Sequence, residues 1–549
     1  MQTNVLEYLE RGALARCPDG VAARSDDSTC TYRELADWAR SCAADLCQRV
    51  SATRQPIAVY LPKHWQVIVA DLGILYSGNC YSNLDVNSPP QRMRAILDNL
   101  QPAAVITSAD LLPKLVALGF PLERLVTLAE IQSVAAAIPA EASAAALANR
   151  RASALDTDPV CIINTSGSTG IPKSVAMNHR NVIDFIDWTL ETFTFGPRDV
   201  FGSLSPFYFD IYTLELYVAL ATGASISIIP DSLAPFPAKL VEHLAKNHVT
   251  FLFWVPSVMV NIANMGLLDK FDLSALTRVF FAGEVFPTRQ FNLWRRALPQ
   301  AQFVNLYGPI EITVDCTYYI IDREFADNEP LPIGIPCRNT EILILDANDR
   351  PAGAGQTGEL CVRGSSLAMG YWNNPERTAA AFVQNPLNTA YPEMIYRTGD
   401  LASWNERGEI MFAGRKDYQI KHMGYRIELG EIETAVTSIG EISAGCVVYN
   451  AEQKEITLFY SSENDLSPGE IRKRLAPALP GYMLPRVFHR LDVMPLNPNG
   501  KIDRHHLHQR LNRRDSRTNT VSAHSHGPLT SDPSPARGEG NSGAKSAGK

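Results

Sequence analysis

Short runs of apolar residues recur along the first four hundred positions of the chain, and stretches with apolar residues three and four apart lie between several of them. Short apolar runs predict buried β-strands, and the wider spacing predicts amphipathic helices. Strands are expected at 57–61, 103–107, 160–163, 225–229, 251–255 and 279–282, and a helix at 179–193. Strands that alternate with helices are typical of layered α/β folds.

The pattern changes after about position 340. The runs at 341–346 and 358–363 are shorter and separated by turn residues, which predicts a β-rich subdomain. A domain boundary is expected near 414–417, followed by a compact α+β stretch. From about Arg513 the chain is rich in Ser, Gly, Pro and Asn and almost free of large apolar residues, which predicts a disordered tail. The expected domains are residues 1–416, 417–512 and 513–549.

A segment dense in hydroxyl groups and glycines follows the strand at 160–163. It reads Thr165-Ser166-Gly167-Ser168-Thr169-Gly170-Ile171-Pro172-Lys173. Glycine lets backbone N–H groups approach an anion, the hydroxyls add donors and the lysine adds positive charge, so the loop suits a polyphosphate between a strand and the helix at 179–193. It is not a Walker A loop, because Ile171 and Pro172 separate Gly170 from Lys173. A flexible surface loop is the alternative interpretation.

Composition narrows the class of protein. With 549 residues, 46% hydrophobic and 20% charged, the chain has the composition of a soluble globular protein of more than one domain. A net charge of −8 gives no overall attraction to nucleic acid or to an anionic membrane. No window reaches the roughly 18 apolar residues of a membrane span. The ten cysteines lack CxxC pairs and the N-terminus lacks a signal core, so a cytoplasmic protein is expected.

Five further motifs follow the loop in a fixed order. They are Tyr307-Gly308-Pro309-Ile310-Glu311, Tyr396-Arg397-Thr398-Gly399-Asp400-Leu401, Gly414-Arg415-Lys416-Asp417, Gly424-Tyr425-Arg426-Ile427-Glu428-Leu429-Gly430-Glu431-Ile432-Glu433 and Asn499-Gly500-Lys501-Ile502-Asp503-Arg504. Each alone is weak. Together with the loop they resemble the adenylate-forming superfamily, and more closely the amino-acid adenylation domains of nonribosomal peptide synthesis. The resemblance extends from about Thr31 to Arg504.

This resemblance implies an α/β fold: a large N-terminal domain of layered α/β subdomains plus a β-rich subdomain, with a small mobile α+β C-terminal lid domain. Asp417 falls where the family has its hinge, and a rigid-body rotation about a hinge is a recognised switching device. The implied first reaction joins a substrate carboxylate to the α-phosphate of ATP and releases pyrophosphate. The implied second reaction transfers the acyl group to a thiol.

The resemblance also implies catalytic roles for Lys501 and Glu311. Lys501 matches the lysine that bridges the substrate carboxylate and the phosphate, and a solvated surface lysine is the alternative. Glu311 matches a carboxylate beside Mg²⁺, a cation that prefers oxygen ligands, and a turn-capping role is the alternative. The implied ATP contacts are Thr165, Ser166, Gly167, Ser168, Thr169, Gly170, Lys173, Tyr307, Asp400 and Arg415.

Within that set, Tyr307 is expected to stack on adenine, and Asp400 to accept hydrogen bonds from the ribose hydroxyls. A structural ion pair is the alternative for Asp400. Two positions depart from the family pattern: Ile310 replaces a usual Thr, and Ser174 replaces a usual Gly. Loss of one hydrogen bond typically costs about 1 kcal/mol. Since neither change removes a charge, weaker or slower use of ATP is expected, and not an inactive fold.

Asp210 matches the aspartate that pairs with the α-amino group in amino-acid-activating members, a charge-assisted contact. The implied substrate pocket is lined by Asp210, Ile211, Leu214, Phe253, Phe280, Ala282, Gly283, Leu306, Val314 and Asp315. Its mostly apolar wall is similar to that of stand-alone proline-activating enzymes, which implies L-proline or a close cyclic relative. Asp315 departs from that pattern, and a carboxylate there must be paired, hydrogen-bonded or protonated. A small amino acid with a polar or basic tip is therefore the alternative substrate.

For the second reaction, Phe209 falls where the family places an aromatic gate beside the pantetheine tunnel, and a core phenylalanine is the alternative. No carrier-protein motif follows Arg504. A discrete carrier protein with a phosphopantetheine arm is therefore expected as acceptor, in secondary metabolism of the nonribosomal-peptide type, by an enzyme that is a monomer. Two other functions stay open: a coenzyme A or amide ligase that releases a free product, and a non-catalytic nucleotide-binding protein.

Overall fold

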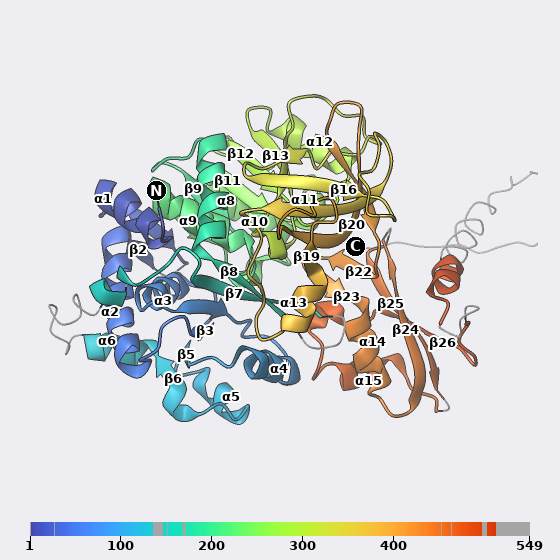
Figure 1. The fold of residues 1–549 in the computed structure, drawn as a ribbon, viewed down its shortest axis with the longest axis horizontal. Helices are drawn as coiled ribbons and strands as arrows, with labels where there is room; N and C mark the ends of the chain where they lie inside the picture. The colour runs from blue at the N-terminus through green and yellow to red at the C-terminus, as the bar shows by residue number, and fades with distance from the viewer. Residues whose placement is uncertain are drawn as a thin grey trace, which may run out of the picture.

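The computed structural model describes residues 2–26, 28–135, 147–150, 152–167, 172–451, 453–462, 464–496 and 502–511. The expected tail at 513–549, together with Ser168, Thr169, Gly170 and Lys501, lies outside the described residues. Two large β-sheets, a smaller sheet and a C-terminal lobe (residues 417–511) make up the described structure (Figure 1). None of its helices is long and apolar enough to cross a membrane.

The first large sheet has seven strands in the order β18-β8-β7-β4-β3-β5-β6. The strands are β3 Pro56–Tyr60, β4 Cys80–Asn83, β5 Ala104–Thr107, β6 Leu125–Thr127, β7 Pro159–Thr165, β8 Lys173–Asn178 and β18 Gly370–Tyr371. The segments between them include α2 Tyr32–Arg49, α3 Trp65–Tyr76, α4 Pro90–Leu100, α5 Leu112–Ala117, η2 Leu122–Arg124 and α6 Leu128–Ala135. Strands β3 to β7 run parallel, whereas β8 is antiparallel to β7.

The second large sheet has nine strands in the order β15-β14-β13-β12-β11-β9-β10-β1-β2. They are β1 Val21–Arg24, β2 Thr29–Thr31, β9 Val200–Ser203, β10 Ser225–Ile228, β11 Phe251–Trp254, β12 Arg278–Phe281, β13 Gln302–Tyr307, β14 Thr317–Ile320 and β15 Ile335–Pro336. Its helices are η1 Tyr8–Ala13, α1 Leu14–Arg16, α8 His179–Thr192, α9 Ile211–Thr222, η3 Asp231–Leu233, α10 Pro237–Lys246, α11 Pro256–Asn264, α12 Thr288–Ala297 and η4 Ile310–Ile312. Strands β9 to β13 are parallel, so their carboxyl ends meet at one edge of the sheet, where ligands of open α/β sheets bind.

One hydrophobic core joins the two large sheets. It contains Val59 of β3 and Val160 of β7 from one sheet, and Phe253 of β11 from the other, together with residues of α2, α3, α8 and α9. The two large sheets are therefore held together by one packed interior, and close packing resists changes in the position of one sheet relative to the other. Figure 1 shows these helices beside the strands of both sheets.

The smaller sheet and the C-terminal lobe complete the fold. The smaller sheet contains β16 Thr340–Leu345, β17 Gly358–Gly364, β19 Phe382–Gln384, β20 Met394–Trp404 and β21 Ile410–Arg415, with α13 Pro375–Ala381 beside it. The lobe contains β22 Gln419–His422, β23 Tyr425–Glu428, α14 Leu429–Thr437, β24 Ile442–Asn450, β25 Glu455–Ser462, α15 Pro468–Leu475, η5 Gly481–Met483 and β26 Val487–Arg490. The lobe has a hydrophobic cluster of its own, as an independent unit requires.

Most of the expected elements are confirmed to within two residues. The six strands expected at 57–61, 103–107, 160–163, 225–229, 251–255 and 279–282 correspond to β3, β5, β7, β10, β11 and β12, and the expected helix corresponds to α8. The β-rich subdomain is also present, as β16 to β21.

Two local expectations are wrong. The Gly-rich loop does not lead directly into a helix, because β8 follows it and pairs with β7, from Thr165–Lys173 to Pro159–Asn178. Ser174, Val175, Ala176 and Met177 are all buried there, so both faces of this short strand are covered. The Thr398-Gly399-Asp400 motif does not end a strand either, since it lies inside β20, where Gly399 adopts φ +72°.

Candidate functional site

A cavity of about 150 Å³ lies where the carboxyl ends of the two large sheets meet the C-terminal lobe. Segments far apart in the sequence line it: the ends of β4 and β7, the turns after β12 and β13, and β22 and β23 of the lobe. The lining residues are Asn83, Leu84, Asp85, Ser88, Arg92, Ile96, Ile163, Asn164, Thr165, Ser166, Tyr208, Phe209, Asp210, Gly283, Gly308, Pro309, Ile310, Asp400, Arg415, Gln419, Lys421, Gly424, Tyr425, Arg426 and Tyr482.

The Gly-rich loop closes a β-hairpin at one side of this cavity. Thr165, the last residue of β7, is paired with Lys173, the first residue of β8. The Thr165 hydroxyl is buried and has no hydrogen-bond partner in the part of the chain that the structure describes. A buried hydroxyl without a partner is costly unless a ligand satisfies it. This orphaned donor, with the loop amides and Lys173, is a donor set that fits a polyphosphate.

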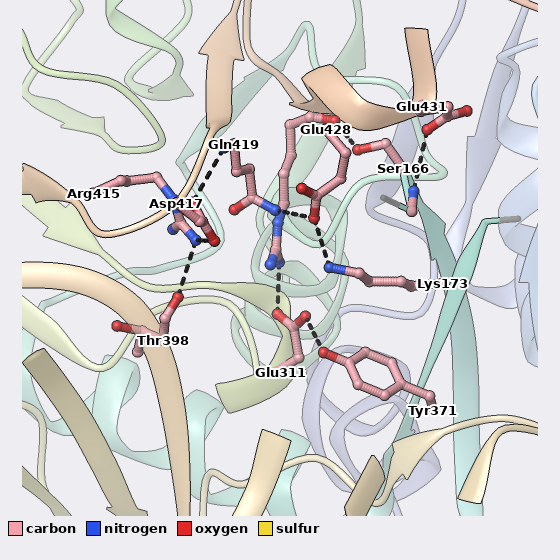
Figure 2. A network of polar contacts seen from close by, with 12 residues as sticks. Ser166, Lys173, Glu311, Tyr371, Thr398, Arg415, Asp417, Gln419, Glu428 and Glu431 are labelled. Atoms are coloured by element: carbon pink, nitrogen blue, oxygen red, sulfur yellow. Dashed lines mark hydrogen bonds and ion pairs between the residues drawn. The ribbon is translucent and has the colours of Figure 1, made fainter. Parts of the chain in front are cut away.

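In the structure, groups of the C-terminal lobe accept from three described donors of this loop, on Ser166, Gly167 and Lys173 (Figure 2). Lys173 Nζ donates to Glu428 Oε1 over 2.7 Å, the backbone N–H of Gly167 donates to Glu431 Oε2 over 3.1 Å, and Ser166 Oγ donates to the Arg426 carbonyl over 2.5 Å. Burial lowers the pKa of the Lys173 ammonium, and the nearby charge of Arg426 acts in the same direction.

A second polar cluster surrounds Tyr307, at the end of β13. Its hydroxyl donates to Asp400 Oδ2, while Arg415 Nη1 donates to Asp400 Oδ1 over 2.6 Å. The same guanidinium donates to Asp417 over 2.6 and 2.7 Å. The structural ion pair considered for Asp400 is thus present. One carboxylate serves two donors, and Asp400 and Arg415 line the cavity.

Glu311 lies in η4, directly after the Tyr307 motif, and is fully buried. Its carboxylate accepts from the Tyr371 hydroxyl over 2.8 Å and from Arg426 Nη1 over 2.7 Å (Figure 2). Burial alone would raise the pKa of Glu311, but the charges of Arg426 and Lys173 lower it to about 2. Glu311 is therefore held ionised at neutral pH.

This carboxylate fits a magnesium site of the kind that phosphates complete. The described residues contain no group of three or more His, Cys, Asp or Glu side chains that could hold a metal alone. Mg²⁺ keeps several waters and commonly binds one or two carboxylates plus phosphate oxygens, so a single ionised Glu beside a polyphosphate loop suffices.

Two acidic residues and one lysine meet at the expected substrate pocket. Burial raises the pKa of Asp210 to about 6, against the effect of the Lys421 charge. Burial also raises the pKa of Asp315 well above its ordinary value, and the Asp210 charge raises it further. Asp315 Oδ2 is buried and has no hydrogen-bond partner among the residues that the structure describes. Lys421 of β22 acts on both carboxyl groups, and burial lowers the pKa of its ammonium.

The apolar members of the expected pocket lie behind this acidic pair. Phe253 of β11 and Phe280 of β12 are register partners, and Leu306 belongs to β13 next to them. All the expected apolar side chains are buried in the core that joins the large sheets: Ile211, Leu214, Phe253, Phe280, Ala282, Leu306 and Val314. Of the expected set, only Asp210 and Gly283 line the cavity itself. The apolar residues form the packed wall behind it.

Backbone strain marks the turn that carries Val314 and Asp315. Thr313 has φ +60° and Val314 has φ +67°, a conformation that β-branched residues rarely adopt. Such residues cost about 1–3 kcal/mol each and persist where the surroundings hold them. Here the Thr313 hydroxyl donates to the Ser366 carbonyl over 2.9 Å, and the Asp315 N–H donates to the Thr313 carbonyl over 3.0 Å. The turn therefore fixes the position on the backbone from which the Asp315 side chain extends.

The two departures from the family pattern have different surroundings. Ile310 is buried and lines the cavity, so an apolar side chain faces the site at that point. Ser174 lies in β8, where its hydroxyl donates to Asn164 Oδ1 over 2.7 Å and accepts from Asn99 over 2.8 Å. Ser174 is thus satisfied within the protein.

The C-terminal lobe supplies functional residues that sequence reasoning missed, namely Gln419, Lys421, Arg426, Glu428 and Glu431. They lie in and around the 424–433 motif, which marked the segment but not these side chains. Phe209, the expected gate, packs edge-on against Tyr425 at 5.3 Å between ring centres, and Tyr425 stacks on Tyr482. The aromatic position at 209 thus faces the lobe.

Lys501 lies outside the described residues, but its neighbour Ile502 does not. Ile502 packs with Cys446, Val448 and Leu507, on the face of the β24-β25-β26 sheet opposite to α14. Because α14 carries Glu431 and so faces the Gly-rich loop, Ile502 lies on the side of the lobe away from the cavity.

Comparisons with known proteins agree with this geometry. The model of a family described as AMP-binding enzyme matches residues 9–372. Zwittermicin A synthase ZmaJ of Bacillus cereus is 32% identical over 514 residues, which cover 92% of this chain and 94% of that protein. One of the proteins of the mycosubtilin synthase of Bacillus subtilis is 33% identical over 505 residues, or 90% of this chain. Those residues are 19% of that protein, so the chain spans about a fifth of its length.

Two solved structures share the fold. The Vibrio cholerae adenylation domain AlmE, in complex with glycyl-adenosine-5'-phosphate, superposes with a TM-score of 0.77 at 22% identity and covers 93% of this chain and 97% of that one. The artificially fused adenylation–PCP di-domain NpsA-ThdA from Klebsiella oxytoca gives a TM-score of 0.74 at 23% identity, over 90% and 95%. At these identities the superpositions establish the fold alone.

Proposed function

The chain belongs to the family of AMP-binding enzymes, and from this premise we propose that it activates an amino acid as its aminoacyl adenylate and then transfers the aminoacyl group to a thiol. The main support for this proposal is that Asp210, a carboxylate suited to an α-ammonium, lines the same cavity as the Gly-rich loop and Asp400. An amino acid and an ATP molecule bound together in this cavity could thus reach Asp210 with the amine, the Gly-rich loop with the phosphates and Asp400 with the ribose.

The nucleotide would lie between the Gly-rich loop and the Tyr307 cluster. We assign the adenine to the face of the Tyr307 ring and the ribose hydroxyls to Asp400, which already accepts two hydrogen bonds at the cavity wall. Thr165, Ser166, Gly167 and Lys173 would hold the β- and γ-phosphates, as would Ser168, Thr169 and Gly170 from outside the described residues. The orphaned Thr165 hydroxyl supports this assignment.

Glu311 would hold Mg²⁺ beside those phosphates. The bound cation offsets phosphate charge as the substrate carboxylate approaches the α-phosphorus. The protein keeps the Glu311 carboxyl deprotonated. The Tyr371 hydroxyl donates to Glu311 Oε1 and so holds the carboxylate in position.

Lys501 is proposed as the catalytic lysine that neutralises the reacting carboxylate and phosphate oxygens. Since Ile502 packs away from the cavity, the adenylation step requires a second orientation of the C-terminal lobe, reached by rotation about Asp417. The orientation described here presents Lys421 and the Phe209–Tyr425 contact instead, which suits it to the thiol-transfer step.

The substrate is proposed to be L-proline or a close cyclic relative, because bulky apolar residues pack behind Asp210 and leave little room. One observation favours a second class. Asp315 has an unpartnered buried oxygen, which a substrate with a polar or basic tip would satisfy. The thiol is proposed to be the phosphopantetheine of a discrete carrier protein in nonribosomal-peptide-type metabolism. The carrier domain of the similar NpsA-ThdA fusion supports that acceptor.

A pyrophosphate-exchange screen tests the activation step. Proline, hydroxyproline, alanine and ornithine separate the two substrate classes, and cyclic amino acids are expected to give the highest rates. Mass spectrometry of reactions with coenzyme A or with carrier proteins then identifies the acceptor by its thioester. If no amino acid supports exchange, a nucleotide-binding protein without catalysis replaces this proposal.

A further inference from the structure

A side-chain amide on the wall of the cavity lacks one hydrogen-bond partner within the described structure. Asn83, the last residue of β4, lines the cavity and is 7% exposed. Its Oδ1 is buried and accepts no hydrogen bond from any residue that the structure describes. A buried amide oxygen without a donor is costly, because it gives up its hydrogen bond to water and receives none in return. A ligand in the cavity that brings a donor would remove that cost.

Two neighbouring acceptors fix which end of this amide lacks a partner. Asn83 Nδ2 donates to Asp71 Oδ2 over 3.0 Å and to the Phe207 carbonyl over 3.2 Å. A side-chain amide has two N–H groups and one carbonyl oxygen, and both N–H groups are used here. Exchanging the nitrogen and the oxygen would place an acceptor opposite the Phe207 carbonyl, which can only accept. The end of Asn83 that lacks a partner is therefore the oxygen, which can only accept a hydrogen bond.

The polar groups behind Asn83 hold this acceptor in place. Asp71 lies in α3 and is fully buried, and its Oδ2 also accepts from the Tyr212 hydroxyl over 2.9 Å. Tyr212 belongs to α9, the helix that Asp210 caps, and its ring stacks on Phe207 at 4.3 Å between ring centres. Asn83 is thus tied to the segment that carries Asp210. A preorganised acceptor favours binding, because little conformational entropy is lost when the ligand arrives.

The two substrates of the adenylation step leave Asn83 unassigned. Thr165 and Asp400 are assigned to the nucleotide, and the carboxylate of Asp210 suits the α-ammonium better than a neutral oxygen does. A donor for Asn83 must then come from the third participant, the thiol. Other parts of the cavity lining suit a long arm that carries this thiol, since they come from the chain after β4, the turn before α9 and the C-terminal lobe. These residues include Leu84, Asp85, Ser88, Tyr208, Phe209 and Tyr425.

We propose that Asn83 Oδ1 accepts a hydrogen bond from an amide N–H of the arm that carries the acceptor thiol, so that Asn83 is a specificity residue for secondary amides in the transfer step. The proposal rests on the proposed function for the thiol and its phosphopantetheine arm. That arm contains two secondary amides, each with one N–H donor. A neutral acceptor matches a neutral donor without burying a charge. A thiol of the same length that lacks the N–H leaves Asn83 unsatisfied and should react more slowly.

Thiols with and without the N–H test this contact on the full chain without any substitution. The thiols are pantetheine and two analogues, each with an ester oxygen in place of one amide N–H. Their rates of thioester formation are compared with the amino acid that gives the fastest pyrophosphate exchange. We expect at least one analogue to react about ten-fold more slowly than pantetheine, which corresponds to about 1.4 kcal/mol.

Equal rates for all three thiols would overturn the proposal. The Asn83 oxygen would then be satisfied inside the protein, by a proton on Asp71. The Asp71 carboxyl has a buried Oδ1 without a partner among the described residues, and burial raises its pKa to about 8. A protonated carboxyl group can donate to an amide oxygen, whereas an ionised one cannot.

Two variants test whether the preference for the amide belongs to Asn83. Asn83→Leu offers no acceptor, so pantetheine and the slower analogue should react with it at the same rate. Tyr212→Phe is the matched control, because it removes a hydrogen bond to Asp71 and leaves the Asn83 amide in place. The preference should persist in that control. A preference that survives in Asn83→Leu, or that disappears in Tyr212→Phe as well, would overturn the proposal.

Failure of the proposed function and failure of this inference give different results. If pyrophosphate exchange proceeds but none of the thiols forms a thioester, the proposed transfer step fails and this inference fails with it. If all three thiols form thioesters at equal rates, only the inference fails.

Discussion

Burial raises the pKa of the Asp315 carboxyl, which is 2% exposed, and the neighbouring charge of Asp210 raises it further; one Asp315 oxygen has no hydrogen-bond partner among the described residues. Two acidic groups beside the same pocket cannot both ionise cheaply unless a cation balances them. In this orientation of the C-terminal lobe Lys421 is that cation, and a substrate ammonium would take the same role when bound.

Asp315→Asn should therefore stabilise the protein, and more so at higher pH. An unfolded Asp loses its proton near pH 4, whereas burial, followed by the Asp210 charge, raises the native pKa of Asp315 well above that. Between those two pKa values the native state holds an extra proton, so wild-type stability falls as pH rises, by up to about 1.4 kcal/mol per pH unit. Urea unfolding of the wild type and of Asp315→Asn at pH 5.5 and 7.5 measures the difference in their free energies of unfolding.

The stabilisation by Asp315→Asn should exceed its pH 5.5 value at pH 7.5 by about 1–3 kcal/mol. Asp269→Asn, at an exposed position, is the matched control and should change stability equally at both pH values. If the free energies of unfolding of Asp315→Asn and the wild type differ by the same amount at both pH values, the Asp315 carboxyl is not protonated in the native protein.

Asp210→Asn should reduce amino-acid activation by two orders of magnitude or more, because it removes the charge opposite the α-ammonium. The wild-type activity should also depend on pH. Burial raises the native pKa of Asp210 to about 6, so below pH 6 the carboxyl is protonated and kcat/KM for the amino acid should fall about ten-fold per pH unit. Pyrophosphate exchange from pH 5 to 8 gives the profile.

In Asp210→Asn the fall below pH 6 should be absent from the residual activity. The des-amino analogue of the best substrate serves as the control, since it cannot pair with Asp210. Wild-type activation of that analogue at a rate equal to the amino acid would contradict the amine-anchor role.

Local motifs were enough to predict much of this site. Thr165, Tyr307, Glu311 and Asp400 stand in short segments whose neighbours are chemically specific, and the structure brings all four around one cavity or directly behind it. Strand β7, which ends at Thr165, could also be predicted, because buried parallel strands consist of nearly continuous apolar residues.

Contacts between the lobes could not be predicted in the same way. Lys173 and Glu428 are 255 positions apart, and their contact depends on how one rigid body rests on another. Neither side chain breaks a local pattern that would reveal its partner. The hairpin at β8 was missed for a different reason: its apolar run, Val175-Ala176-Met177, is too short to separate a strand from the start of a helix.

Substitutions of Lys421 and Lys501 should impair different half-reactions. Lys421 acts on Asp210, Asp315 and Asp400 in the described orientation, so Lys421→Met should slow thiol transfer from a preformed adenylate and spare pyrophosphate exchange. Lys501→Ala should abolish exchange, with the fold and ATP affinity largely intact. Exchange kinetics, single-turnover transfer and nucleotide binding by calorimetry measure the three quantities. Undiminished exchange in Lys501→Ala would remove that lysine from catalysis.

Lys63 supports the loop that leads to Asp210, and its loss should destabilise the protein. Its ammonium donates to the carbonyls of Ser203, Leu204 and Ile229 over 3.0, 2.6 and 3.1 Å, at the ends of β9 and β10. Its charge also lowers the pKa of the buried Glu215, which burial raises. Leaving buried acceptors without their donor typically costs about 1–3 kcal/mol, so Lys63→Met should lower the free energy of unfolding by about that amount.

Urea unfolding of Lys63→Met, Glu215→Leu and the double variant measures how far the two residues depend on each other. Because the charge of Lys63 favours the ionised form of Glu215, the two changes should couple, and the double variant should be more stable than the sum of the single changes, by about 1–3 kcal/mol. Additive losses would show that Lys63 acts only through the three carbonyls. In that case Lys63→Met should still raise the KM for the amino acid, since the Ser203–Leu204 backbone holds the segment that ends at Asp210.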